Sequence, residues 1–130
     1  MKKMTDQILV IDDEPDAEDL FKQHFRREIR KGQLELVFAN SGETAIQLLD
    51  EEAEPSAHAV FSDIKMPGMS GLDVLKAIKD RWPNIPVYMI TAFGSDEMEQ
   101  KVLNMGACGF FTKPLNFSAL SEVISTEQSE

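Results

Sequence analysis

Short apolar runs alternate with helix-like segments along the whole chain, and this alternation constrains the fold more than any other feature. The runs have the length of strands, and the first, Gln7-Ile8-Leu9-Val10-Ile11, has the β-branched content of a strand buried on both faces. We predict strands at residues 7–11, 34–38, 58–62, 86–91 and 109–112. Apolar spacing and capping residues predict helices at residues 15–31, 42–52, 72–82, 95–104 and 117–124.

Five repeats of strand and helix with short connections predict a parallel sheet covered by helices on both faces. The expected architecture is a doubly wound α/β fold with five strands in the flavodoxin-like order 2-1-3-4-5. A chain of 130 residues fits a single domain. We expect that domain to span residues 1–125, with residues 126–130 forming a frayed polar tail or the start of a linker.

Charge and composition exclude several classes of protein. The net charge is −10, from 13 basic and 23 acidic residues, so the surface should repel nucleic acid and direct nucleic acid binding is not expected. A single cysteine, Cys108, excludes an internal disulfide and indicates a reducing compartment; we expect its thiol to be buried. No apolar run approaches the ~18 residues of a membrane span, and no signal peptide begins the chain. We therefore expect a cytoplasmic protein without a membrane partner.

Chemically active side chains follow the predicted strands. Asp12 and Asp13 end the first strand, Asp63 ends the third, Thr91 ends the fourth, and Lys113 follows the fifth. In a doubly wound sheet, ligands bind at the carboxyl ends of the strands near the point where the order reverses. That point lies between strands 1 and 3, which are neighbours ~4.8 Å apart. The carboxylates of Asp13 and Asp63 can therefore approach one cation.

This set of side chains favours phosphoryl chemistry. Clustered carboxylates repel one another unless a cation joins them, and Mg²⁺ prefers carboxylate, water and phosphate oxygens. An anion beside that cation would meet the ammonium of Lys113 and the hydroxyl of Thr91. Metal, carboxylate, hydroxyl and lysine are the parts of a phosphoryl-transfer site. No histidine or cysteine is available there, which argues against zinc.

Four segments in this order resemble the response-regulator receiver family over about residues 7–124. They are V-I-D-D-E-P, S-D-I-K-M-P-G-M-S-G, M-I-T-A and F-F-T-K-P. The resemblance implies that Asp63 accepts a phosphoryl group from a histidine kinase or a histidine phosphotransfer protein. It also implies roles for the surrounding residues: Mg²⁺ held by Asp12, Asp13, Asp63 and the backbone carbonyl of Lys65, and phosphoryl oxygens bound by Thr91 and Lys113.

The resemblance further implies a signalling switch rather than an enzyme, one that assists only its own phosphorylation and dephosphorylation. Thr91 would move toward the phosphoryl group, and Phe110 would turn into the vacated space. This change would reshape the face formed by helix 4, strand 5 and helix 5, which controls an output partner that the sequence does not identify. The resemblance is also compatible with a homodimer that forms on phosphorylation. The Lys113-Pro114 peptide bond is expected to be cis.

Several of these residues have a second interpretation. Asp12 and Asp13 are also suited to cap the helix that begins near Pro15. Phe110 is as consistent with the hydrophobic core as with a switch. The basic stretch at residues 22–31 fits a solvated helix end, or a surface for an acidic partner.

Two other functions compete with the switch. An aspartyl-phosphate hydrolase would place its nucleophile after the first strand with a second acid two residues later. Here Asp12 and Asp13 are adjacent, and no cap domain is present to select a substrate. A protein-binding module that is never phosphorylated would be expected to have lost parts of the site, yet every position is filled.

Lys65 and Phe93 are predicted to set the lifetime of the phosphorylated state. They lie two residues after Asp63 and two after Thr91, where a side chain can admit or orient the hydrolytic water. Neither can position water as a hydrogen-bond acceptor, so we predict slow self-dephosphorylation. The alternative is that both side chains point into solvent and the rate is average.

Overall fold

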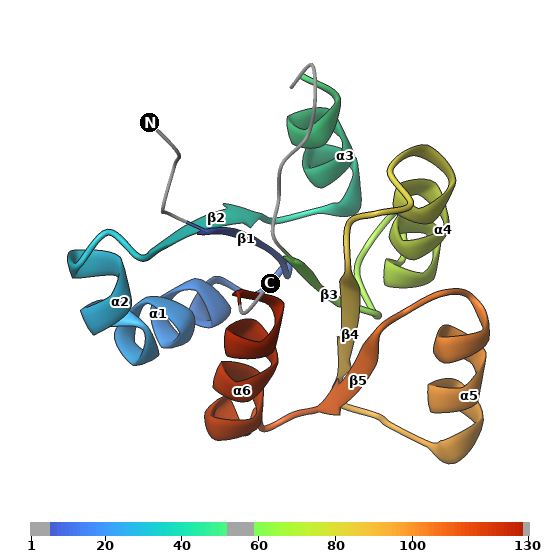
Figure 1. Ribbon diagram of the computed structural model, residues 1–130. Helices are drawn as coiled ribbons and strands as arrows, with labels where there is room; N and C mark the ends of the chain where they lie inside the picture. The colour runs from blue at the N-terminus through green and yellow to red at the C-terminus, as the bar shows by residue number, and fades with distance from the viewer. Residues whose placement is uncertain (1–5, 52–58, 129–130) are drawn as a thin grey trace.

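The computed structural model describes residues 6–51 and 59–128 and contains a sheet flanked by helices (Figure 1). Its strands are β1 (Asp6–Ile11), β2 (Leu34–Ala39), β3 (Ala59–Asp63), β4 (Val87–Thr91) and β5 (Gly109–Thr112). Its helices are α1 (Pro15–His24), α2 (Arg26–Arg30), α3 (Gly42–Asp50), α4 (Gly71–Arg81), α5 (Asp96–Asn104) and α6 (Phe117–Gln128). None of the helices in these ranges combines the length and the apolar character needed to cross a membrane.

All five strands are parallel and lie in the order β2-β1-β3-β4-β5, which confirms the predicted topology. The order reverses between β1 and β3. The register pairs Ile11 with Ser62, so the residues that follow β1 lie beside the end of β3. It also pairs Asp63 with Ile90 and Thr91 with Thr112. The carboxyl ends of the four adjacent strands therefore meet at one edge.

Alternate residues of each strand pack into two apolar clusters, one on each face of the sheet. Leu9 and Ile11 of β1 join the cluster covered by α3, α4 and α5, whereas Ile8 and Val10 join the cluster covered by α1 and α6. Figure 1 shows these two groups of helices on opposite sides of the sheet. Burial on both faces explains why the central strands are almost continuously apolar in sequence.

The first helix differs from the single segment predicted for residues 15–31. It is interrupted at Phe25, whose φ of −101° and ψ of 19° leave the helical region, so α1 and α2 are separate elements. Phe25 stays buried at 3% exposure. After it, α2 forms a separate short helix, and the amide of Ile29 donates to the carbonyl of Phe25 at 2.9 Å.

Other boundaries also differ. The last helix continues to Gln128 instead of ending near residue 124. Cys108 is exposed, so the prediction of a buried thiol is wrong; it directly precedes β5, which is the last strand at one side of the described sheet. The predicted strand residue His58 lies outside the described residues.

Candidate functional site

Asp63 is the last residue of β3 and is 6% exposed. Its backbone is held by α4, because the amide of Gly71 donates to the carbonyl of Ile64 at 2.8 Å. A Cβ on Gly71 would lie 2.1 Å from the carbonyl oxygen of Asp63, so only glycine permits this approach. The start of α4 is fixed in turn by a capping box between Ser70 and Asp73.

Asp12 approaches Asp63 from β1. Its amide donates to the carbonyl of Ala39 at 3.1 Å, which continues the sheet by one residue, and its side chain is 8% exposed. Its Oδ1 accepts a hydrogen bond from the amide of Glu14 at 2.9 Å. Glu14, rather than Asp12 or Asp13, occupies the N-cap position of α1 and makes no side-chain cap hydrogen bond. Asp12 thus supports the turn into α1 and also faces the site.

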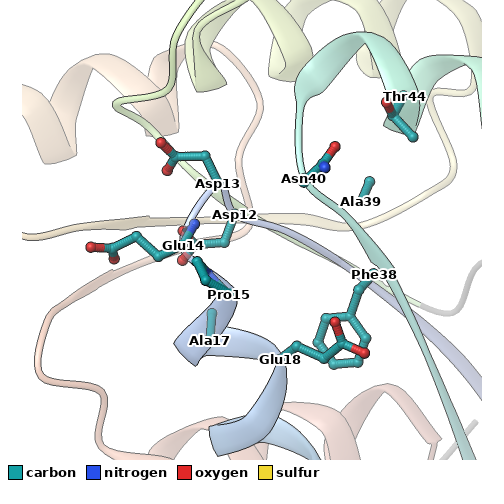
Figure 2. A pocket seen from close by; sticks show the side chains of 10 residues that line it. All are labelled: Asp12, Asp13, Glu14, Pro15, Ala17, Glu18, Phe38, Ala39, Asn40 and Thr44. Carbon is teal, nitrogen blue, oxygen red and sulfur yellow. Dashed lines mark hydrogen bonds between the residues drawn. The ribbon is translucent and has the colours of Figure 1, made fainter.

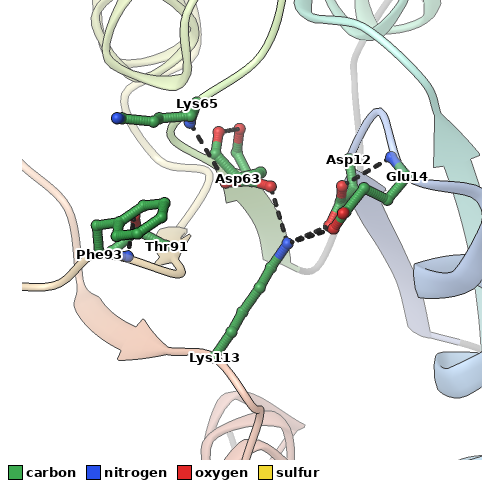
Figure 3. Close-up of polar contacts among 8 residues, drawn as sticks. Asp12, Glu14, Asp63, Lys65, Thr91, Phe93 and Lys113 are labelled. Carbon is green, nitrogen blue, oxygen red and sulfur yellow. Dashed lines mark hydrogen bonds and ion pairs between the residues drawn. The ribbon is translucent and has the colours of Figure 1, made fainter.

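Lys113 joins the acids from the end of β5 (Figure 3). Its ammonium donates to Asp63 Oδ2 at 2.9 Å, to Glu14 Oε1 at 3.0 Å and to Asp12 Oδ2 at 3.2 Å. These contacts show that the lysine stem spans β4 and brings its charge to the ends of β1 and β3. The Lys113-Pro114 peptide bond is cis, as predicted.

Electrostatic interactions keep this lysine charged. Burial lowers the pKa of Lys113, but the hydrogen bonds to Asp63 and Glu14 and the charge of Asp12 outweigh burial, so its pKa lies above the ordinary value. The pKa of Asp12 is raised, mainly by burial and further by the charge of Asp63, although the Glu14 amide and Lys113 oppose the increase. With all groups ionised, three carboxylates and one ammonium leave an excess of two negative charges.

The carboxylates fit a hard divalent cation. One oxygen each from Asp12, Glu14 and Asp63 lie within 4.8 Å of one another. The group contains oxygen donors and no nitrogen or sulfur donor, which suits Mg²⁺ and not zinc. The excess negative charge favours a divalent cation of either kind, so the preference for Mg²⁺ rests on the oxygen donors. Glu14 was not predicted as a member, although its position directly after the acid pair was a usable signal.

Asp13 lies outside this group. It is exposed, and Figure 2 shows its carboxylate pointing away from that of Asp12. It lines a cavity of about 500 Å³ between the start of α1 and the end of β2, where Asn40 and Thr44 form the opposite side. The structure thus brings Asp12 and Asp63 together, whereas Asp13, the acid that the strand ends were expected to bring to Asp63, lies at the rim.

Thr91 and the two residues predicted to control hydrolysis lie on the other side of Asp63. Thr91 is 3% exposed, and its hydroxyl accepts a hydrogen bond from the amide of Phe93 at 3.1 Å. The amide of Lys65 donates to Asp63 Oδ1 at 3.3 Å. The Lys65 ammonium lies 5.0 Å from the centroid of the Phe93 ring (Figure 3). Lys65 and Phe93 therefore pair with each other beside Asp63, although Phe93 is 71% exposed.

Phe110 lies on β5 and is half-buried. It packs against the apolar cluster beneath α3, α4 and α5. Its ring also borders the loop after β4, because a Cβ on Gly94 would lie 3.3 Å from Phe110 Cε2. Phe110 thus contacts both the core and the loop that carries Phe93, so the two interpretations of this residue are compatible.

Comparison with known proteins agrees with this geometry. Residues 8–125 match the family model of the response regulator receiver domain. The chain is 36% identical over 120 residues to the response regulator protein PilR of Pseudomonas aeruginosa, covering 91% of this chain and 25% of that protein. It is 31% identical over 121 residues to sporulation initiation phosphotransferase F of Bacillus subtilis, covering 93% of this chain and 92% of that protein.

Solved structures give the same result. A response regulator receiver domain protein from Clostridium thermocellum matches with a TM-score of 0.83 and 28% identity, covering 95% of this chain and 94% of the other. The signal receiver domain of a DNA-binding response regulator from Colwellia psychrerythraea matches with a TM-score of 0.84 and 26% identity, covering 96% and 99%. The chain spans only a quarter of PilR and 19% of the response regulator FleR, which is also from Pseudomonas aeruginosa.

Proposed function

Because the chain belongs to the response regulator receiver family, we propose that it is a phosphoacceptor switch in which Asp63 receives the phosphoryl group. The donor is a histidine kinase or a histidine phosphotransfer protein. The observation that carries the proposal is the contact of 2.9 Å between Asp63 Oδ2 and the Lys113 ammonium, inside a group of carboxylates at the strand ends. We also propose that the receiver domain spans residues 1–125 and that residues 126–130 form a tail or the start of a linker.

In the transfer step, a carboxylate oxygen of Asp63 attacks phosphorus and the nitrogen–phosphorus bond of the donor breaks. The phosphoryl group thus moves from imidazole to carboxylate, and the imidazole leaves. Lys113 is near enough to follow the phosphoryl oxygens, and its raised pKa keeps it cationic while charge develops. The Thr91 hydroxyl can donate to the same oxygens once it turns from its present bond with the Phe93 amide.

Transfer requires Mg²⁺ in this proposal. When bound, Mg²⁺ would supply positive charge that offsets the charge of the transferred phosphoryl group. Asp12 and Asp63 would hold it together with the carbonyl of Lys65, and the remaining carboxylate comes from Asp13 or Glu14. The resemblance favours Asp13, whereas Glu14 is the acid found within 4.8 Å of the other two.

Paired variants distinguish these two acids. Magnesium affinity can be followed by amide shifts of Asp63 and Lys65 during titration, for Asp13→Asn and Glu14→Gln in parallel. The variant that loses a ligand should lose at least about tenfold in affinity, as expected for removal of a charged interaction. Unchanged affinity in both variants would remove both acids from the metal site.

The switch itself would connect Thr91 to Phe110. Movement of the Thr91 hydroxyl toward the phosphoryl group vacates space beside β5, into which the Phe110 ring turns. The predicted helix 4, strand 5 and helix 5 correspond to α5, β5 and α6, since α2 is the additional helix. This face would then bind the output partner, or a second phosphorylated copy.

A direct test uses acetyl phosphate as the donor. Intact mass should increase by one phosphoryl group when magnesium is present, and should not change with chelator. Asp63→Asn should remain unmodified under the same conditions. Equal labelling of Asp63→Asn would overturn the assignment of the acceptor, and labelling that persists in chelator would overturn the role of Mg²⁺.

A further inference from the structure

A second surface lies away from Asp63, where α1 and α2 meet the edge of the sheet. A groove of about 600 Å³ has Ile29, Leu34 and Leu36 as its apolar lining. The basic residues Lys22, Arg26 and Arg30 lie along it, together with one acid, Glu35. Figure 1 shows α1 and α2 next to β2 at one side of the molecule.

The charge of this surface is opposite to that of the chain as a whole. Residues 22–31 contain five basic residues and one acid, a net charge of +4, in a chain of net charge −10. Lys22 is paired with Glu18 at 2.7 Å. Among residues 7–51 and 59–124, whose side chains the structure describes, no acidic partner of Arg26 or Arg30 is found. Within these ranges, no ion pair of the two guanidinium groups competes with an external anion.

The groove also borders an open strand edge. Among the strands that the structure describes, β2 pairs only with β1, so the main-chain groups on its other side have no strand neighbour in that part of the chain. Such an edge can accept an extended segment as an additional strand, with main-chain hydrogen bonds giving affinity and alternate side chains giving specificity. The break at Phe25 precedes α2, and Arg26 and Arg30 of α2 line the groove beside this edge.

We propose that this groove binds an extended acidic segment of a partner protein along the β2 edge. A second copy of the chain fits less well, because pairing of two β2 edges about a two-fold axis would bring both sets of arginines together. The groove begins at Leu34, the residue of β2 farthest from the strand ends that carry the phosphoacceptor site. Occupancy therefore leaves Asp63 accessible, and this proposal does not depend on the function proposed for Asp63.

The test uses a fluorescein-labelled peptide of six Val-Glu repeats and measures anisotropy at low ionic strength. The wild-type chain should bind it, and Arg26→Glu/Arg30→Glu should weaken binding at least about tenfold, the size expected for loss of two charged contacts. The matched control, Lys76→Glu/Lys101→Glu, makes the same charge change on α4 and α5 and should bind as wild type does. Amide shifts on peptide addition should be largest at residues 34–36.

Four outcomes would overturn the proposal. They are no binding of the peptide, equal weakening in the control variant, shifts confined to residues outside the groove, and tight arginine-dependent binding of duplex DNA or phosphatidylglycerol vesicles without peptide binding. Circular dichroism establishes that each variant is folded. If the double reversal unfolds, Arg26→Gln/Arg30→Gln replaces it, with about a threefold loss expected because charge is removed rather than reversed.

Discussion

Lys113 contacts all three carboxylates of the site and lies beside the proposed phosphoacceptor. In the structure, its ammonium neutralises part of the charge of Asp12, Glu14 and Asp63. After phosphorylation, the same ammonium has phosphoryl oxygens within reach. Removing the charge should therefore affect the phosphorylated state more than the resting fold.

The side chains of Lys65 and Phe93 lead to a prediction about how fast Asp63 loses its phosphoryl group. The pair lies beside Asp63, and neither side chain can accept a hydrogen bond from water. We expect slow loss of phosphate, and we expect both Lys65→Asn and Phe93→Glu to accelerate it by about tenfold or more, because an acceptor that positions water contributes 10²–10⁴-fold to such reactions. The measurement is decay of phosphorylated protein in magnesium buffer. Decay at the parental rate in both variants would exclude control of water by these residues.

At the scale of elements, the start of α4 determines the position of Asp63. Gly71→Ala should destabilise the fold by about 1–3 kcal/mol, because the new Cβ meets backbone atoms of Asp63 and Ile64 that cannot move independently. Phosphorylation of Asp63 should slow as well. The two quantities are obtained from urea unfolding and from the rate of labelling.

Gly42→Ala provides the matched control, since Gly42 occupies the same first helical position in α3. Its new Cβ would meet side-chain atoms of Val74 and Met69 and no backbone atom of Asp63 or Ile64, although buried Val74 is β-branched and adjusts little. A loss of stability with an unchanged labelling rate is expected. A labelling rate in Gly71→Ala equal to that of the parent would show that α4 does not position the acceptor.

The elements also show which features a sequence can predict. The ends of β1, β3 and β4 were predictable, because apolar runs stop where charged or hydroxyl side chains begin. The break at Phe25 was not, since Phe21, Phe25 and Ile29 keep a continuous helical spacing across it. The position of Glu14 rather than Asp13 beside Asp12 and Asp63 depends on side-chain directions at a turn, and the Lys65–Phe93 contact joins two separate loops. Neither arrangement could be predicted, because no residue spacing in the sequence indicates it.

At the scale of the whole molecule, the acidic cluster links cation binding to stability. Three carboxylates with one ammonium leave an excess of negative charge, and a ligand that binds only the folded state stabilises it by about 2.7 kcal/mol at a hundredfold excess over Kd. Magnesium should therefore raise the Tm by several degrees, and chelator should reverse the increase. Asp63→Asn should reduce this response, as followed by thermal circular dichroism. A Tm indifferent to magnesium would contradict cation binding at the strand ends.

The central claim is that Asp63, among 23 acidic residues, is the one that carries the phosphoryl group. Borohydride reduction of the phosphorylated protein converts an aspartyl phosphate to homoserine, with phosphate as the leaving group, and so marks the acceptor permanently. Peptide sequencing by mass spectrometry after labelling with acetyl phosphate and magnesium should find homoserine at position 63 and aspartate at positions 12 and 13. Homoserine at position 12 or 13, with aspartate retained at position 63, would contradict the account.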